Sequence, residues 1–355
     1  MEQLPLEILG DIMLYLSSPD LLKLCKVSSI FISLINYLKI VLDFSGTNIT
    51  DNDLMFLSGI HYINLNSCWN ITDKGVKALA GVKSINLNNY EKRISDEGIK
   101  ALSGVESISL NSCWNITDEG LKALAGVKNI YLRGCGNITD EGLKYLSGVK
   151  NINLHSCYMY ITDEGLKYLA GVHTINLHSC KKITDEGLKY LSGVRNIKLN
   201  GCGNITDKGI KYLFGVKNIN LEFCNKISIE GLRTLSIVNT INLSYCNNIT
   251  NEGLKYFSDV HTIKLNNYNN ITDEGLKYLS GVHTIFLDDC NITDKGLKYL
   301  SKIHTINLRY CKNITDDGIK VLNGVHTLNL WNCKNITNKG VKTLSKVKKL
   351  FHHNS

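Results

Sequence analysis

A unit of 21 to 23 residues recurs along this chain from residue 49 to its end. Each copy opens on Ile followed by Thr or Ser, as in residues 161–180, ITDEGLKYLAGVHTINLHSC. A fixed period in this range predicts a solenoid, in which each repeat is one structural unit that stacks on the next. The opening pair stands at 49–50, 71–72, 94–95, 116–117, 138–139, 161–162, 183–184, 205–206, 227–228, 249–250, 271–272, 292–293, 314–315 and 336–337.

Within one repeat, residues 172–191 read VHTINLHSCKKITDEGLKYL. Ile175 and Leu177 alternate with polar residues, which predicts a short strand with one buried face. Thr184 then offers a hydroxyl to cap a helix, and two acidic residues suit the positive end of that helix. Leu188 and Leu191 share one face of the helix because they are three residues apart. Each repeat is therefore expected to be a strand, a loop and a short helix.

Neither element can bury its apolar face alone, so the repeats must stack. We expect thirteen parallel strands about 4.8 Å apart, with helices on the outside and Ile, Leu and Cys in the core. The pattern LxxLxLxxC followed by xxITDxGLxxL resembles the cysteine-containing leucine-rich repeats. The resemblance implies an α/β fold, a horseshoe solenoid with parallel strands inside and helices outside. It covers residues 40–355, as about 13 to 14 repeats of 21 to 23 residues.

Eleven of the twelve cysteines occupy one position of the repeat, and Tyr90 and Tyr268 take the same position in two other repeats. Because tyrosine replaces cysteine there, we interpret the row as buried packing residues rather than disulfides. Reduced thiols favour an intracellular location, cytoplasmic or nuclear. No secretory signal is visible at the start of the chain, and its apolar stretches are too short to span a bilayer. The cysteines of the row are Cys68, Cys113, Cys135, Cys157, Cys180, Cys202, Cys224, Cys246, Cys290, Cys311 and Cys333.

Residues 1–39 lie outside the repeats and carry three apolar stripes at helical spacing. Ser18 or Asp20 is expected to cap the second helix, with Pro19 in its first turn. Three helices of this size carry more apolar surface than they can bury by themselves. Some of that surface must face the first repeat, and some is available for a partner.

The same residues resemble an F-box. The match runs from Leu4-Pro5 through Glu7-Ile8-Leu9 and Pro19-Asp20-Leu21 to Leu34. In that family such residues dock on a Skp-family adaptor, which connects to a cullin ubiquitin ligase. The alternative is that the helices only cap the first strand of the solenoid, near Ile40 to Leu42. The adaptor contacts that the resemblance implies are Leu4, Pro5, Ile8, Ile12, Leu16, Leu21, Leu24 and Val27.

A candidate target-binding patch lies near the C-terminal end of the repeats, on the face formed by the strands. Asp288, Arg309 and Trp331 occupy the same position in three consecutive repeats, so we expect them about 5 Å apart. Exposed Trp, Tyr and Arg are the residues that most often anchor protein interfaces. The alternative is that the patch satisfies itself, with Asp288 paired to Arg309 and Arg309 stacked on Trp331. The predicted substrate-binding residues are Phe286, Asp288, Asp289, Arg309, Tyr310 and Trp331.

Two further rows of charged or titratable residues have simpler interpretations. His261, His283, His304 and His326 share one repeat position, but the pattern places no carboxylate or thiolate beside them, so we predict no metal site. Lysines on the outer helices follow a glutamate by three residues in many repeats, as in Glu119–Lys122 and Glu164–Lys167, and such pairs support the helix locally. The net charge of +8 is therefore not a strong indication of nucleic-acid binding.

The sequence carries no catalytic constellation and no phosphate-binding glycine loop, and its cysteines are expected to be buried, so we predict neither enzymatic activity nor a cofactor. The resemblances together imply a substrate-recruiting subunit of a cullin-type (SCF) ubiquitin ligase. In that interpretation the F-box binds the adaptor and the concave face binds the target, with no nucleic-acid or membrane partner. The alternative is a stand-alone binding scaffold, inhibitor or decoy, whose N-terminal helices act only as a cap.

Overall fold

The computed structural model describes residues 6–90, 93–157, 159–267 and 270–352. These residues contain fifteen strands, each of two or three residues, rather than the thirteen expected from the repeat count. The additional strands lie near the two ends of the array, where the repeat pattern is least complete. The strands are β1 Leu42–Asp43, β2 Tyr62–Asn64, β3 Ser84–Asn86, β4 Ser107–Ser109, β5 Asn129–Tyr131, β6 Asn151–Asn153, β7 Thr174–Asn176, β8 Asn196–Lys198, β9 Asn218–Asn220, β10 Thr240–Asn242, β11 Thr262–Lys264, β12 Thr284–Phe286, β13 Thr305–Asn307, β14 Thr327–Asn329 and β15 Lys349–Phe351.

Short helices alternate with these strands, as the repeat predicts. The α-helices are α1 Leu6–Leu14, α2 Ser18–Val27, α3 Ile30–Tyr37, α4 Asp51–Met55, α5 Asp73–Lys77, α6 Asp96–Ile99, α7 Asp118–Ala123, α8 Asp140–Leu143, α9 Asp163–Leu166, α10 Asp185–Leu188, α11 Asp207–Lys211, α12 Ile229–Arg233, α13 Asp273–Leu276, α14 Asp294–Leu297, α15 Asp316–Ile319 and α16 Asn338–Val341. Several continue as a turn of 3₁₀ helix. The 3₁₀ segments that continue an α-helix are η1 Lys100–Leu102, η2 Lys144–Leu146, η3 Lys167–Leu169, η4 Lys189–Leu191, η6 Lys277–Leu279, η7 Lys298–Leu300 and η8 Lys320–Leu322. In one repeat the 3₁₀ segment η5 Asn251–Phe257 takes the place of the α-helix.

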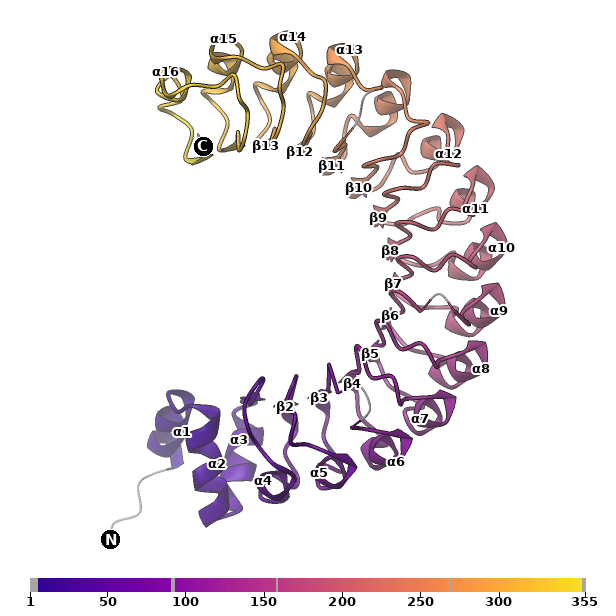
Figure 1. Ribbon diagram of the computed structural model, residues 1–355, viewed down its shortest axis with the longest axis vertical. Helices are drawn as coiled ribbons and strands as arrows, with labels where there is room; N and C mark the ends of the chain where they lie inside the picture. The colour runs from indigo at the N-terminus through magenta and orange to yellow at the C-terminus, as the bar shows by residue number, and fades with distance from the viewer. Residues whose placement is uncertain (1–5, 91–92, 158, 268–269, 353–355) are drawn as a thin grey trace. The chain divides into compact units, whose positions relative to one another are not determined.

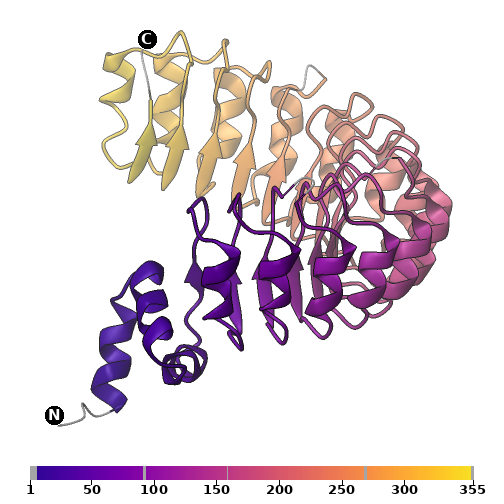
Figure 2. The same ribbon diagram turned by 60° about the horizontal axis from the view of Figure 1, so that its bottom comes forward.

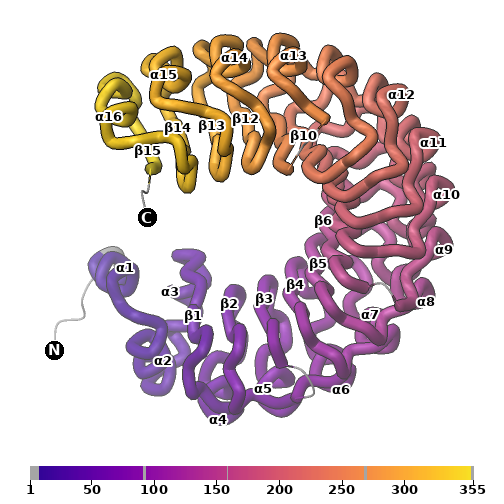
Figure 3. The backbone as a smooth tube through the Cα atoms, turned by 45° about the horizontal axis from the view of Figure 1, so that its top comes forward, coloured from indigo at the N-terminus to yellow at the C-terminus, as the bar shows by residue number. Residues whose placement is uncertain are grey.

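The chain divides into two compact units, Met1–Ile175 and Asn176–Ser355. In the first unit β1 to β6 pair in parallel in chain order, and in the second β8 to β15 do the same. The register places equivalent residues side by side, such as Ile241 beside Ile263. Within each unit the strands line one side and the helices the other (Figure 1), and the backbone makes one coil per repeat (Figure 3).

The core of each repeat is formed by the residues that the alternation predicts. Ile175, Leu177, Leu188 and Leu191 are each at most 1% exposed. All twelve cysteines are buried as free thiols, and those of the repeat row serve as hydrogen-bond donors as well as packing residues. The Cys113 Sγ, for example, donates to the Leu87 carbonyl at 2.9 Å. The Tyr90 hydroxyl replaces a thiol in this role and donates to the Leu65 carbonyl at 2.7 Å.

An aspartate at the first residue of most helices ties each repeat to the next. Its carboxylate accepts one hydrogen bond from the backbone N–H and one from the hydroxyl of the Thr or Ser that precedes the following helix. We call this contact the aspartate clasp. The described clasps are Asp51–Thr72, Asp73–Ser95, Asp96–Thr117, Asp118–Thr139, Asp140–Thr162, Asp185–Thr206, Asp207–Ser228, Asp273–Thr293, Asp294–Thr315 and Asp316–Thr337.

Three helices precede the first strand, α1, α2 and α3 (Figure 2). The cap of α2 is Ser17, whose side chain accepts from the Asp20 N–H, rather than Ser18 or Asp20, and Pro19 lies in the first turn as expected. The hydroxyl of Ser18 instead accepts from the Asp43 N–H on β1 at 2.7 Å. This contact fixes α2 to the first strand, which begins at Leu42 rather than Ile40.

Asn36 of α3 closes the junction between the helices and the repeats. Its amide donates to the Gly59 carbonyl at 2.9 Å and accepts from the His61 N–H at 2.8 Å, so it satisfies two backbone groups at the start of β2. Lys26 of α2 forms an ion pair with Asp53 of α4 at 2.7 Å. The N-terminal helices therefore contact the first repeats, which both interpretations of these helices expect.

Candidate functional site

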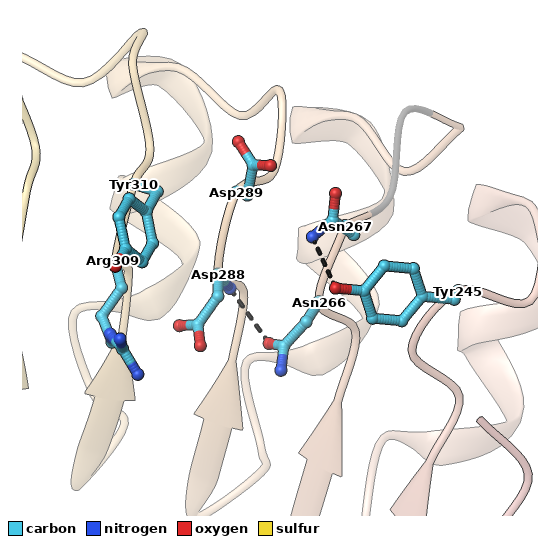
Figure 4. A pocket seen from close by; sticks show the side chains of 7 residues that line it. All are labelled: Tyr245, Asn266, Asn267, Asp288, Asp289, Arg309 and Tyr310. Atoms are coloured by element: carbon cyan, nitrogen blue, oxygen red, sulfur yellow. Dashed lines mark hydrogen bonds between the residues drawn. The ribbon is translucent and has the colours of Figure 1, made fainter. Parts of the chain in front are cut away.

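A pocket of about 380 Å³ opens at the turns that follow β10 to β13, all within the second unit (Figure 4). Each turn lies at the C-terminal end of its strand, so the side chains project from the end of the strand face. The lining residues are Tyr245, Asn266, Asn267, Asp288, Asp289, Arg309 and Tyr310.

The backbone of these turns determines which side chains face the pocket. The residue before the cysteine position has a positive φ in most repeats, including Tyr245 (60°), Asn267 (59°), Asp289 (53°) and Tyr310 (62°). Glycine takes this conformation without strain, and Gly134 and Gly201 occupy the position in two other repeats. A bulky residue is costly there. Tyrosine at this position is therefore not explained by the needs of the turn.

Four of the six predicted substrate-binding residues line this pocket: Asp288, Asp289, Arg309 and Tyr310. The other two lie outside its lining. Phe286 is on β12, half-buried beneath the ammonium of Lys264, which lies 4.8 Å from the ring centroid. Trp331 lies on the turn after β14 with its side chain 42% exposed.

Asp288 has the most unusual environment in the pocket. Figure 4 shows it between Asn266 and Arg309, and its backbone N–H donates to the Asn266 Oδ1 at 3.0 Å. Among the described residues, its own Oδ1 is buried without a hydrogen-bond partner. Burial raises the pKa of the Asp288 carboxyl, while the positive charges of Arg309 and Lys264 act in the opposite direction. A buried acceptor without a donor is costly, so a ligand that donates a hydrogen bond here would gain free energy.

The basic residues around Asp288 do not neutralise it by direct pairing. The Arg309 guanidinium lies over the ring of Tyr310, 5.3 Å from its centroid. In the described residues no ion pair within 4.0 Å joins Arg309 to Asp288. Asp289 is paired instead with Lys312, at 3.8 Å. The pocket therefore does not show the ion pair of Asp288 with Arg309 that the alternative interpretation includes.

The sequence interpretation missed Tyr245, Asn266 and Asn267. Tyr245 stacks on Phe223 with ring centroids 4.4 Å apart, and its hydroxyl accepts from the Asn267 amide at 2.9 Å. Tyr245 could have been identified by aligning the repeats with one another. The position before the cysteine is Ser, Gly or Asn in most repeats, and aromatic only at Phe223, Tyr245 and Tyr310 among the described ones. A large aromatic residue where the backbone prefers a small one indicates a role outside the fold.

The predicted adaptor contacts divide into exposed and buried residues. Ile8 and Ile12 are 47% and 44% exposed on α1, and Val27 at the end of α2 is 83% exposed. Leu16 and Leu24 are half-buried. Leu21 is 1% exposed, so it belongs to the core of the helical unit and does not reach its surface. Leu4 and Pro5 lie outside the described residues.

Within the described chain, no group of three or more His, Cys, Asp or Glu side chains is arranged to hold a metal ion. Every described helix is too short or too polar to cross a membrane.

Residues 1–43 match the F-box domain family. Separate segments match the leucine-rich repeat family, and these are residues 60–80, 105–125, 128–147, 172–192, 238–258, 267–280, 287–301 and 299–322. The chain carries an F-box domain followed by leucine-rich repeats. This F-box and leucine-rich repeat architecture is typical of non-catalytic adaptor proteins.

Solved structures resemble this F-box and leucine-rich repeat chain in fold. A chain of the TLR13–ssRNA13 complex is 16% identical with a TM-score of 0.62, covering 88% of this chain and 50% of its own length. The internalin InlF of Listeria monocytogenes is 19% identical with a TM-score of 0.57, covering 80% and 90%. A chain of the yeast Rad7–Elc1 complex is 15% identical with a TM-score of 0.56, covering 94% and 88%. A comparison with curated proteins gives no significant match.

Proposed function

We propose that this chain is the substrate-recruiting subunit of a cullin-type ubiquitin ligase. Its F-box helices bind a Skp-family adaptor, and the pocket and turns after β10 to β14 bind a protein target. The chain contributes no chemistry of its own. It raises the effective concentration of target lysines near a ubiquitin-conjugating enzyme that the rest of the ligase supplies.

The observation that supports adaptor binding most strongly is the uncovered apolar surface of the F-box helices. Ile8 and Ile12 are one helical turn apart, so they form one exposed stripe on α1. Val27 adds a third exposed apolar side chain at the end of α2. Exposed apolar side chains on successive turns of one helix favour an interface with another polypeptide.

The strand-end pocket supports target binding by its composition. Tyr245, Tyr310 and Arg309 are residue types that anchor protein interfaces, and Trp331 follows on the next turn. The pocket combines aromatic faces with the unsatisfied Asp288 acceptor. A target segment that inserts an apolar or amide-bearing side chain there would be held by both features.

A second candidate is a stand-alone binding scaffold, inhibitor or decoy. The contacts of Ser18, Lys26 and Asn36 with the first repeats favour it, because they give the helices a sufficient role as a cap. The two candidates share the target-binding surface and differ only in whether α1 binds an adaptor.

Adaptor binding is tested with recombinant Skp-family adaptor and the full chain. We expect the wild-type chain to co-purify with the adaptor, and the Ile8→Ala/Ile12→Ala variant to lose at least about tenfold in affinity. The matched control is Met55→Ala, which removes a side chain 57% exposed on α4, outside the F-box helices. Failure of the intact chain to bind any adaptor would favour the scaffold.

Target binding is tested by affinity capture from cells in which the proteasome and cullin neddylation are blocked. The variants are Trp331→Ala, Arg309→Ala and Tyr310→Ser, the last introducing the residue that other repeats carry at this position, as at Ser112. We expect each variant to lose the same preys while retaining the adaptor. Lys189→Ala, on the outer helices, is the control. Identical prey sets for wild type and all three variants would refute the proposed target surface.

A further inference from the structure

A row of eight residues lies at the opposite end of the strands from the pocket. Each residue immediately precedes a strand, from β8 to β15, and we call the row the strand-start strip. Backbone hydrogen bonds connect adjacent members, such as Lys217 N–H to the Arg195 carbonyl at 2.8 Å and Lys348 N–H to the His326 carbonyl at 3.1 Å. The strip consists of Arg195, Lys217, Asn239, His261, His283, His304, His326 and Lys348.

The four histidines of the strip form a continuous stack. Adjacent ring centroids are 4.4, 4.5 and 4.3 Å apart, with interplanar angles of 16°, 18° and 14°. Each Nδ1 lies 3.0 to 3.1 Å from the hydroxyl of the threonine that follows it. The inner ring faces and the Nδ1 atoms are therefore occupied, and the four Nε2 atoms have no hydrogen-bond partner within the described chain.

Permanent positive charges flank the stack at both ends. Arg195, Lys217 and Lys348 are exposed, and none forms an ion pair in the part of the chain that the structure describes. The strip itself contains no acidic residue. In the first unit the residues that precede β2 to β7 include one acidic residue, Glu106, which pairs with its neighbour Lys128 at 2.8 Å. The strip thus differs from its counterpart in having no internal counter-charge.

The turns that lead into these strands add little negative charge. The residues that stand two positions before each member of the strip are Gly193, Gly215, Ile237, Asp259, Gly281, Lys302, Gly324 and Lys346. Asp259 is the only acidic residue among them, and Lys302 and Lys346 oppose it. Partial desolvation and then the neighbouring charges of His261 and His304 lower the pKa of His283. A counter-charge close to His283 would offset this repulsion when the ring is protonated.

We propose that the strand-start strip binds an extended peptide segment rich in Asp and Glu, and that the histidine stack takes up protons as this segment binds. Carboxylates along the row of Nε2 atoms would accept hydrogen bonds from them and offset the repulsion between adjacent imidazolium ions. Because protonation and binding favour each other, the affinity rises as the pH falls.

The stack geometry favours an acidic peptide over a nucleic acid. Proteins that bind single-stranded nucleic acid use aromatic faces on which bases stack, alongside a positive groove. Here the inner imidazole faces are covered by one another, so the stack offers its edges rather than a platform for bases. The threonines that follow the histidines are half-buried and provide no platform either. Edges that donate hydrogen bonds suit carboxylates.

The same geometry opposes a metal site. Stacked parallel rings direct their Nε2 lone pairs side by side instead of toward one point, whereas a tetrahedral ion needs converging ligands. No carboxylate or thiolate completes a set in the described residues.

The strip does not depend on the proposed ligase function. It lies at the N-terminal ends of the strands, whereas the pocket lies beyond their C-terminal ends and the adaptor surface is on α1. Variants that abolish adaptor or target binding should leave acidic-peptide binding unchanged. The two proposals can therefore fail separately.

The test measures the fluorescence anisotropy of a labelled poly-glutamate peptide with the full chain. We expect binding at about pH 5.5 to be at least about tenfold tighter than at about pH 8. His283→Gln/His304→Gln should remove most of this pH dependence while leaving the binding at about pH 8 unchanged. Arg195→Gln/Lys217→Gln should weaken binding at both pH values by a similar factor, because these charges do not titrate in this range.

The matched control is His61→Gln, since His61 also precedes a strand but lies against Tyr62 rather than in the stack. This variant should behave as wild type. Three results would overturn the proposal: no binding of poly-glutamate at either pH, a pH dependence that survives the double histidine substitution, or tighter binding of single-stranded polyuridylate than of poly-glutamate.

Discussion

The carboxylate of Asp185 accepts hydrogen bonds from both the backbone N–H and the hydroxyl of Thr206, at 2.8 and 2.6 Å. Thr206 in turn caps α11 by accepting from the Lys208 N–H at 3.2 Å. The Asp185 side chain, at the start of α10, thus fixes the position of the start of α11.

Asp185→Ala should destabilise the chain by about 1–2 kcal/mol, because the Thr206 N–H loses its acceptor and the cap loses its support. Asp185→Asn should cost less, since Asn251 already replaces aspartate in another repeat and accepts from the Thr272 N–H at 3.0 Å. Urea unfolding monitored by circular dichroism measures both. Equal losses for the two variants would contradict the role assigned to the clasp.

Gly209→Ala should destabilise strongly, by about 2 kcal/mol or more. A Cβ at this glycine would lie 2.3 Å from the Asp185 Oδ1 and 3.1 Å from its Cα, so the clasp would have to move. Gly253→Ala is the matched control, because the equivalent residue of the preceding repeat is Ile229 and the nearest atom is 3.3 Å away. Thermal unfolding should show a clearly lower melting temperature for Gly209→Ala than for Gly253→Ala. Similar melting temperatures would refute the explanation that glycine is needed because the aspartate of the preceding repeat lies against it.

The segment Asn251–Phe257 should exchange its amide hydrogens faster than α11. Ile229 takes the aspartate position before it, so Thr250 has no clasp, its side chain makes no capping hydrogen bond, and the segment is entirely 3₁₀ helix. Ile229→Asp should restore the clasp and slow exchange there about fivefold, the effect of about 1 kcal/mol. Hydrogen exchange read by mass spectrometry tests this, with α11 as the internal control. Unchanged exchange in the variant would contradict it.

The twelve thiols should resist modification while the chain is folded. Burial raises the pKa of Cys113 and of Cys25 to about 11 and that of Cys202 to about 12, so little thiolate forms at neutral pH. A chromogenic disulfide reagent should react with none of them in the native chain and with all twelve in denaturant. A thiol that reacts rapidly in the folded chain would contradict this prediction.

Lys26→Met should destabilise the chain at neutral pH by about 0.5–1 kcal/mol, the range of a partly exposed ion pair. The hydrogen bond from Lys26 lowers the pKa of Asp53. A carboxyl whose pKa is lowered on folding stabilises above its unfolded pKa, about 3.9, and loses that contribution as the pH falls through its folded pKa. The difference between wild type and variant should therefore vanish in acid.

The control for this pair is Lys23→Met, because Lys23 pairs with Asp20 inside α2 and does not connect the helices to the repeats. Urea unfolding at neutral and at acidic pH measures both variants. A difference for Lys26→Met that persists in strong acid would indicate lost packing on Phe56 rather than a lost charge pair.

Much of this fold could be predicted from the sequence because one repeat determines the next. Ile175, Leu177 and Leu188 are buried as their periodicity requires, and Glu164–Lys167 pair at 2.6 Å as their spacing predicts. The aspartate of the pattern was interpreted only as a residue suited to a helix start. Its bond to the following repeat depends on how the repeats stack, which the periodicity of one repeat does not reveal.

The candidate site could be predicted only in part, for a different reason. Asp288, Arg309 and Tyr310 stand out by residue type, and the pocket contains all three. Tyr245 was missed because its environment depends on a positive φ and on its neighbours Phe223 and Asn267. Leu21 was assigned to the adaptor surface by resemblance, but a helical stripe in a three-helix unit does not by itself distinguish the buried face from the exposed one.

The aspartate clasp makes nearly every junction between described repeats chemically alike. If one whole repeat were deleted or duplicated in the gene, the repeats that become neighbours would still place an aspartate carboxylate beside the hydroxyl and N–H of a Thr or Ser. Arrays built in this way can change length in whole units through unequal recombination. The length of the recognition surface can therefore evolve without any change in the contacts between repeats.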